Sequence, residues 1–433
     1  MIQLDASRYK KTGFDEMYFE AVWNIVTKPG KKKNVFVSSQ QNTKQIFGKN
    51  SVEINIRLSL VKDVMWVLKL YEVDGLLEDV SSDKATISDE LLDETLREIE
   101  DLKKAFRNLI LADFRTIKAI CDKLSKNTEY MRIIKKINKK RDEEGNTKSN
   151  GKVTDEDMTG IALRKIYDDY CSLFRNVSNS RFSDSFNNID SQGGEIRKIP
   201  HMNIRIVQTL GIRTCPYCNK EFIGNRGTDV MGATLDHFFS KSRFPLFALS
   251  LYNLIPSCNT CNTVKSDIKS GDMISPFEDI NMDDYIRFEY DMTNNIVSIK
   301  PIKELKEGKY NAELLERVRS NIKVLKLEEA YAFHSLEVKH FLNRLICYNG
   351  TQLEEIQKLM NMNGVKCSVT ELQKSAFETV YGFTEDEKGL GQEPLSKLYR
   401  DLYKGWQNEG MYRLSGVNSI IPCNINKNSE NAT

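Results

Sequence analysis

Two pairs of cysteines have the residue type and spacing best suited to chemistry. Each pair has the pattern Cys-x-x-Cys, and residues 219–257 separate the pairs. The turn within such a pair lets both sulfurs face one ion, and zinc takes four ligands of this kind in a tetrahedron. No thioredoxin-like βαβ pattern, which would favour a redox role, surrounds either pair. The sequence therefore predicts one structural Zn²⁺ ion, bound by Cys215, Cys218, Cys258 and Cys261.

The segment between the cysteine pairs adds residues that could catalyse hydrolysis. A short apolar stretch, predicted to be a strand, ends in Asp236 and His237. His237 is the only histidine in this region, and a neutral imidazole near pH 7 can accept a proton from water. Asn253 precedes a second apolar stretch, and Asn262 follows the last cysteine, where a helix is predicted to begin. The order is therefore cysteine pair, strand, Asp-His, loop, asparagine, cysteine pair and helix.

This order of motifs resembles the HNH endonuclease family, whose core is a ββα-metal, or His-Me, finger. The matching segments are CPYC, LDHFFSKS, LYNLIPSC and CNTCNTVK, all within residues 211–269. With the later segment SPFED, they are similar more narrowly to HNH proteins of bacterial anti-phage defence loci, of the Septu type or linked to retrons. The resemblance implies hydrolysis of phosphodiester bonds in nucleic acid, with DNA favoured over RNA. The sequence has no GxxxxGK[ST] phosphate loop, so an ATPase or sensor would be a separate partner subunit.

The resemblance also implies a role for each polar residue of the motifs. His237 would be the general base, and Asp236 with Asn262 would bind a catalytic Mg²⁺ or Mn²⁺ ion through hard oxygen ligands. Asn253 would hold the loop that carries His237 by side-chain-to-backbone hydrogen bonds. The family is named for a final histidine that is Asn262 here, which leaves the choice between Mg²⁺ and a softer ion open. Basic residues that could contact phosphates are Lys241, Arg243 and Lys265.

Each of these residues also has a purely structural interpretation. A histidine can be buried against a backbone carbonyl, an asparagine can occupy a turn or cap a helix, and a lysine can be a solvated surface charge. We favour the nuclease interpretation because all of these residues occur together, in the family's order, between two cysteine pairs. The alternative is a catalytically silent zinc-containing module that binds nucleic acid or protein.

Helices are expected to surround this small core. Apolar residues recur at three- and four-residue spacing from Leu92 to Leu124, which predicts one long amphipathic helix. Residues 54–72 are apolar enough for a buried helix or for paired strands, and periodicity does not decide between them. A hairpin is predicted at residues 286–301, and further helices are predicted at residues 161–175, 311–349 and 394–408. The predicted fold class is α+β, a mainly helical chain around a small zinc-stabilised ββα-metal HNH core.

Polar segments at residues 142–155 and 176–199 are predicted to be loops or linkers. They divide the chain into an N-terminal mainly helical region, a linker with a lead-in helix, the HNH core with its zinc cysteines, and a C-terminal hairpin and helical region. The corresponding boundaries are residues 1–176, 177–210, 211–280 and 281–433.

Charge is distributed unevenly in the N-terminal region. Residues 72–100 contain eleven acidic and two basic residues, whereas residues 101–141 contain thirteen basic and four acidic residues. We favour a solvated helical hairpin whose charges partly pair, because runs of charge usually mark exposed faces. The alternative is an arm that contacts phosphates, with its end at Lys135, Lys136, Lys139 and Lys140.

Composition restricts the cellular setting. The nine cysteines are an odd number, and five of them are scattered, so a disulfide scaffold is not expected. No secretory signal and no apolar run of about eighteen residues is visible, so neither a membrane span nor a membrane partner is expected. We therefore expect a cytoplasmic protein. The net charge of +2 does not by itself indicate a partner.

Overall fold

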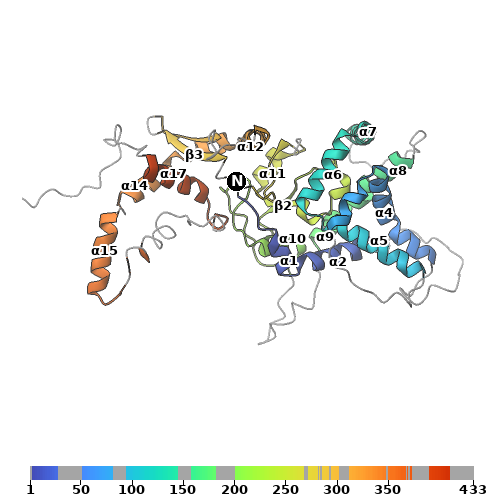
Figure 1. Ribbon diagram of the computed structural model, residues 1–433, viewed down its shortest axis with the longest axis horizontal. Helices are drawn as coiled ribbons and strands as arrows, with labels where there is room; N and C mark the ends of the chain where they lie inside the picture. The colour runs from blue at the N-terminus through green and yellow to red at the C-terminus, as the bar shows by residue number, and fades with distance from the viewer. Residues whose placement is uncertain are drawn as a thin grey trace, which may run out of the picture.

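A small ββα core lies between two helical regions in the computed structural model (Figure 1). The core consists of β1 (Thr234–His237), β2 (Leu254–Ser257) and α11 (Asn259–Lys265). The two strands pair antiparallel, with Asp236 opposite Ile255 in the register. The structure describes residues 2–27, 51–80, 94–144, 158–181, 200–267, 272–280, 282, 285–291, 294–301, 312–347, 350–366, 368, 371–372 and 390–409.

The N-terminal region is helical throughout its described residues. Residues 54–72, for which strands were an alternative, lie almost entirely in a helix, α4. The predicted polar segments at 142–155 and 176–199 fall largely outside the described residues. The α-helices of this region and the lead-in helix α10 are α1 (Ser7–Lys11), α2 (Phe14–Val26), α4 (Ser51–Leu70), α5 (Glu94–Ile110), α6 (Phe114–Lys126), α7 (Thr128–Glu144), α8 (Met158–Lys165), α9 (Phe174–Ser178) and α10 (Met202–Leu210).

The prediction of one long helix from Leu92 to Leu124 is wrong, because the chain breaks between α5 and α6. Asp113 is the N-cap of α6, and its carboxylate accepts a hydrogen bond of 2.8 Å from the backbone N–H of Thr116. Such a cap satisfies a donor that the first helical turn leaves unpaired. The apolar periodicity continues across the break because both helices bury the same kind of face. The helix predicted at 161–175 is also interrupted, by a π-helical turn at Ile166–Tyr170 and a 3-10 turn after it.

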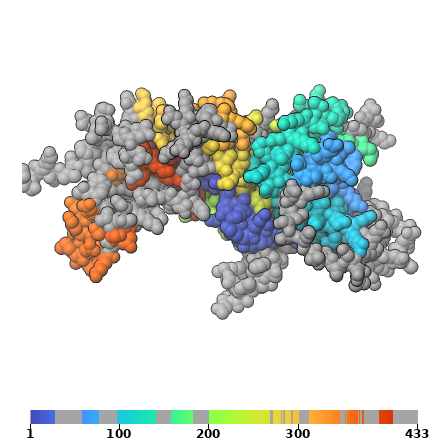
Figure 2. All heavy atoms as spheres, viewed as in Figure 1, coloured from blue at the N-terminus to red at the C-terminus, as the bar shows by residue number. Residues whose placement is uncertain are grey.

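The N-terminal helices pack directly on the ββα core and share one hydrophobic cluster with it. Phe114, at the start of α6, lies edge-on to Phe238 at 5.2 Å and stacks on Phe239 at 5.6 Å between ring centroids. The Tyr18 hydroxyl on α2 donates a 3.0 Å hydrogen bond to the carbonyl of Leu249. Figure 2 shows the surface of α6 and α7 lying against that of the core. The N-terminal helices therefore form a layer whose buried apolar side chains are continuous with those of the ββα core.

The C-terminal region consists of the predicted hairpin and a set of helices. Strands β3 (Ile286–Asp291) and β4 (Ile296–Pro301) pair antiparallel, which confirms the hairpin. Asn295 in its turn has a φ of 57°, in the left-handed region that asparagine tolerates. The segments predicted to be helical contain α12 (Ala312–Val324), α13 (Leu327–Ala332), α14 (Ser335–Cys347) and α17 (Ser396–Glu409), and α15 (Gly350–Met362) follows α14.

One asparagine attaches the C-terminal region to the core. Asn219 directly follows the first cysteine pair, is fully buried and has a φ of 52°. Its side-chain oxygen accepts hydrogen bonds from the backbone N–H of Lys397 at 2.9 Å and from the hydroxyl of Ser396 at 3.1 Å. Its amide nitrogen donates to the carbonyls of Leu390 and Glu393. This side chain therefore supplies partners for the backbone at the start of α17.

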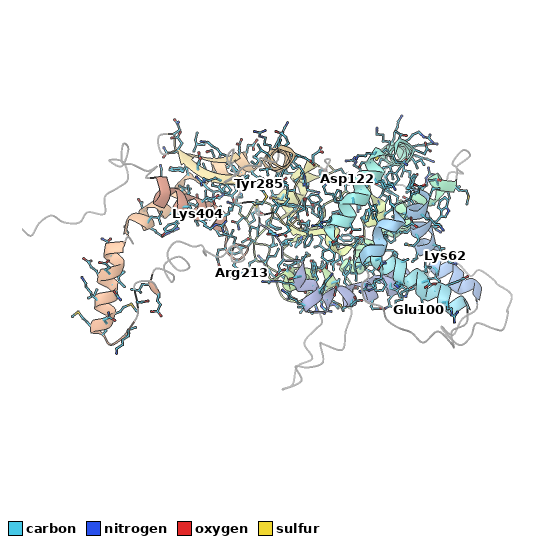
Figure 3. The ribbon with its side chains drawn as sticks, viewed as in Figure 1. Lys62, Glu100, Asp122, Arg213, Tyr285 and Lys404 are labelled. Atoms are coloured by element: carbon cyan, nitrogen blue, oxygen red, sulfur yellow. The ribbon has the colours of Figure 1, made fainter. Side chains whose placement is uncertain are left out.

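No helix in the described part of the chain is long and apolar enough to cross a membrane. Figure 3 shows the side chains of most helices and of the hairpin gathered in the central body of the molecule, whereas α15 projects away from it.

Replacing Asn219 with alanine should destabilise the fold by about 2–4 kcal/mol, because several buried polar groups lose their partners at once. Asn295→Ala is the matched control, since that asparagine also has a left-handed backbone but is exposed. The control should cost about 1–2 kcal/mol, from the backbone contribution and from one hydrogen bond that the Tyr290 hydroxyl donates to the Asn295 side chain. Urea denaturation of both variants measures the difference. Equal destabilisation would show that the hydrogen bonds of Asn219 contribute nothing.

Candidate active site

The four cysteines of the two pairs form one cluster. Their sulfur atoms all lie within 4.8 Å of one another, and all four residues are buried. In a tetrahedron with Zn–S bonds of about 2.3 Å, the sulfurs are about 3.8 Å apart, so the cluster fits a Zn²⁺ ion. Backbone N–H groups point at two of the sulfurs: Lys220 donates to Cys218 Sγ and Cys261 donates to Cys258 Sγ, both at 3.4 Å. These contacts stabilise negative charge on sulfur, as thiolate ligands require.

The cysteine cluster determines where α11 begins. Cys258 is the N-cap of this helix, so the second cysteine pair spans its first turn. Asn262 lies inside the helix, and its backbone N–H donates to the carbonyl of Cys258. The interpretation of Asn262 as the N-cap is therefore wrong. Lys265 lies three residues further along, on the same face of α11, and it contacts Asp236. Asn262 thus belongs to the face of α11 that is turned toward β1.

Asp236 is buried at the end of β1 and has two side-chain partners. The hydroxyl of Tyr217 donates a 2.5 Å hydrogen bond to its Oδ2 atom. The ammonium of Lys265 lies 3.2 Å from Oδ1 and 3.0 Å from Oδ2. Burial and the neighbouring Asp236 carboxylate raise the pKa of Tyr217 well above its usual value, so the phenol keeps its proton and remains a donor.

Lys265 does not lie where a phosphate contact was expected. Its side chain is 0% exposed, whereas a phosphate contact requires an accessible charge. Besides the carboxylate of Asp236, its ammonium donates to the backbone carbonyl of His237 at 3.1 Å and lies over the ring of Phe238. A buried charge is stable only when it is paired, and Asp236 provides that pairing. Lys265 is therefore an internal partner of Asp236 and not part of the described surface.

Lys241 and Arg243 remain accessible on the loop after β1. Lys241 is exposed, and Arg243 is partly exposed with its guanidinium over the ring of Phe244. Two side chains of helix α7 hold the backbone of this loop by hydrogen bonds. The hydroxyl of Tyr130 donates to the carbonyl of Arg243, and the amide of Asn138 donates to the carbonyl of Ser242, both at 2.8 Å.

His237 is partly buried between an aromatic ring and a backbone carbonyl. Its Nε2 atom lies 2.9 Å from the carbonyl oxygen of Ala248, and its ring is edge-on to Phe174 at 4.5 Å. Burial lowers the pKa of His237 to about 4, so the imidazole is neutral at pH 7. Because a carbonyl only accepts, Nε2 must be the protonated nitrogen and Nδ1 the acceptor. This arrangement fits a structural histidine and equally fixes the tautomer that a general base needs.

Asn253 has the contacts that the resemblance to the HNH family implied. It is fully buried, and its side-chain oxygen accepts a 2.8 Å hydrogen bond from the backbone N–H of Phe239. Its amide donates to the carbonyls of Phe239 and Phe247 at 3.1 and 3.0 Å. One side chain thus joins both ends of the loop that follows His237, and a wrong loop position would leave its amide unpaired.

Two residues of this region were not identified from the sequence. Tyr217 contacts Asp236, and Asn219 contacts the start of helix α17. In both cases the partners are far apart in the chain. The position of Tyr217 inside the first cysteine pair was the available signal, because a residue between two metal ligands is held rigidly. The sequence offered no comparable signal for Asn219.

Residues 215–267 match the family model described as HNH endonuclease. The matched segment begins at the first cysteine of the cluster and includes Asp236, His237, Asn253 and Asn262, which supports the resemblance inferred from the motifs. No curated protein and no solved structure matches the chain. These comparisons therefore give no support to the type of defence system that the motif sequences suggest.

Loss of any one cysteine of the cluster should remove the zinc and unfold the core, because two four-residue strands bury too little surface to persist alone. Cys258→Ser is the informative variant, since this residue also caps α11. Zinc content by elemental analysis and circular dichroism measure the effect. Cys121→Ser is the control: Cys121 is equally buried but lies outside the cluster, so its variant should keep its zinc. A zinc-free Cys258→Ser protein with an intact fold would contradict the assignment.

Proposed function

We propose that this protein is a metal-dependent HNH endonuclease that hydrolyses phosphodiester bonds of nucleic acid, with DNA as the preferred substrate. The observation that carries the proposal is a neutral imidazole next to a buried carboxylate, His237 and Asp236, at the end of β1, where Lys265 of α11 contacts the carboxylate of Asp236 and the backbone carbonyl of His237. The match of residues 215–267 to the HNH model supports it. A silent zinc module would need no neutral histidine beside a buried carboxylate.

His237 acts as the general base in this proposal. Its Nε2 atom is engaged with the carbonyl of Ala248, which leaves Nδ1 to take a proton from the attacking water. The low pKa keeps the imidazole neutral at physiological pH, so the base is ready without prior deprotonation. Asn253 maintains the geometry by fixing the loop on which Ala248 lies.

Asp236 and Asn262 are the residues that would hold a divalent cation. Their carboxylate and amide oxygens are the ligands that Mg²⁺ and Mn²⁺ prefer. Asp236 contacts Lys265 of α11, and Asn262 lies three residues before Lys265 on that helix. Tyr217 and Lys265 already use part of the hydrogen-bonding capacity of Asp236, but a carboxylate has about four acceptor positions, so the donor set still fits a cation. Such an ion would polarise the phosphate and stabilise the leaving oxygen.

The substrate-binding surface would extend from the loop at Lys241 and Arg243 onto helix α7. Two hydrogen bonds attach α7 to the backbone of this loop, so the exposed lysines of α7 belong to the same part of the molecule. In the rest of the block at 101–141, Lys103 pairs with Glu20 and Lys118 pairs with Asp122. We restrict the phosphate-contacting alternative to α7, because this helix is the one attached to the loop of Lys241 and Arg243.

The setting of this nuclease is proposed on the resemblance of its motifs alone. The sequences of the segments around the cysteine pairs resemble those of anti-phage defence proteins. This resemblance favours a role as the effector of a bacterial anti-phage defence system, which would act with an ATPase or sensor subunit in the cytoplasm. Co-purification with the products of neighbouring genes, followed by cleavage assays on DNA and RNA, tests this setting.

Replacing His237 with alanine should reduce cleavage by about 10²–10⁴-fold while zinc content and fold are retained, because only the proton acceptor is lost. A plasmid-nicking assay with Mg²⁺ or Mn²⁺ measures the rate, and added imidazole should restore part of it. Asp236→Ala should also lose cleavage, but a high concentration of Mn²⁺ should rescue it in part, since that variant lacks a metal ligand. The exposed His340 provides the control His340→Ala, which should cleave normally. Cleavage by His237→Ala at the wild-type rate would overturn the mechanism.

Changing Lys135, Lys136, Lys139 and Lys140 to glutamine should weaken nucleic-acid binding and flatten its salt dependence, because fewer counterions are released on binding. Fluorescence anisotropy at several salt concentrations measures both quantities. The control removes the same number of charges from the C-terminal helices and the turn between them, at Lys323, Lys326, Lys339 and Lys358. Unchanged affinity and salt slope in the α7 variant would make its lysines an ordinary solvated face.

A further inference from the structure

Asp236 is held by side chains that both come from the segments carrying the zinc ligands. Tyr217 lies between Cys215 and Cys218 in the first cysteine pair. Lys265 lies one turn after Cys261, on the helix that the second pair begins. Through these two partners, side-chain hydrogen bonds connect the segments of the zinc cluster directly to the end of β1.

We propose that Tyr217 is a positioning residue that fixes the carboxylate of Asp236 for binding a divalent cation, and thereby makes that binding depend on the order of the zinc site. The proposal rests on the assignment of Asp236 as a metal ligand in the proposed function. It adds a role for a residue whose hydroxyl does not itself touch the cation or the substrate.

The geometry supports positioning by Tyr217 for two reasons. Its side chain is 0% exposed, so no bulk water can take the place of the hydroxyl beside Asp236. Its backbone is held on both sides by cysteines of the cluster, so the hydroxyl is delivered from a rigid turn. Hydrogen bonds of this kind orient the ligand residues of metal sites, and their loss typically weakens metal binding by about 10–100-fold.

Lys265 has a different part in the same arrangement. Its ammonium neutralises the buried carboxylate and also holds the carbonyl of His237, so it stabilises the end of β1 as a whole. A neighbouring cation repels a divalent ion, so removal of its charge changes metal affinity for more than one reason. Tyr217 is neutral, and its substitution therefore isolates orientation from charge.

The test is Mn²⁺ binding to full-length, zinc-loaded protein, followed by electron paramagnetic resonance of the free ion. Tyr217→Phe should retain its zinc and its melting temperature to within a few degrees, while its affinity for Mn²⁺ falls by about 10–100-fold. Asp236→Asn defines the signal that belongs to this site, because it removes the carboxylate while an amide oxygen of the same shape still accepts from Lys265. In cleavage assays, Tyr217→Phe should need more Mn²⁺ for half-maximal rate but approach the wild-type rate at saturation.

Tyr331→Phe is the matched control. Tyr331 is also buried, and its hydroxyl donates a 2.5 Å hydrogen bond to the carbonyl of Cys218, on the same cysteine pair but away from Asp236. Its substitution should leave the affinity for Mn²⁺ unchanged. If both tyrosine variants weaken Mn²⁺ binding equally, or if Tyr217→Phe loses zinc, the hydroxyl of Tyr217 has only a structural role and the proposal is wrong.

The outcome for Tyr217 is separable from that of the proposed function. Wild-type protein that binds Mn²⁺ through Asp236 but cleaves neither DNA nor RNA would refute the nuclease assignment, and the Mn²⁺ affinities would still decide the role of Tyr217. Wild-type affinity in Tyr217→Phe would overturn the positioning role whatever the activity. Absence of any Asp236-dependent Mn²⁺ binding would overturn it as well.

Discussion

Four buried sulfur atoms within 4.8 Å of one another are the constraint on which the rest of this structure depends. Such a cluster is stable only around a cation, because four thiolates in a buried site would otherwise repel one another. A Zn²⁺ ion bound there would join two turns that are separated by residues 219–257, a segment that contains all of β1 and β2. Closing so long a segment reduces the conformational freedom of the unfolded chain, and this favours the folded core.

The remainder of the chain supplies the burial that the ββα core lacks. A pair of four-residue strands is marginal in water, and here one aromatic ring of α6, that of Phe114, covers the two phenylalanines that follow β1. On the opposite side, Asn219 and Tyr331 connect the first cysteine pair to the C-terminal helices and hairpin. The helical regions therefore support the core. The candidate site itself is built almost entirely from residues of the core.

Local patterns in the sequence predicted most of the secondary-structure elements and the zinc ligands. The predictions failed where contacts between segments distant in the chain determine the structure. The spacing of the four cysteines and the alternation at 286–301 are local signals, and both predictions agree with the structure. The break at Asp113 was missed because apolar periodicity reports which face is buried and not whether the helix is continuous. The burial of Lys265 could not be predicted either, since it depends on a carboxylate 29 residues away in the chain.

Side chains of helix α7 hold the loop after His237 by hydrogen bonds to backbone carbonyl oxygens of the loop, at Ser242 and Arg243. These hydrogen bonds do not involve the side chains of the loop. Within the loop, the side chains that form hydrogen bonds are those of Ser240 and Ser242, so the hydrogen bonds that hold its shape do not use the charges of Lys241 and Arg243. Substitutions at Lys241 or Arg243 can alter the charge and size of the surface beside the site while the loop keeps its course. This separation makes the loop a tolerant place for evolution, or for protein engineering, to adjust the charge of the surface beside the proposed active site without rebuilding that site.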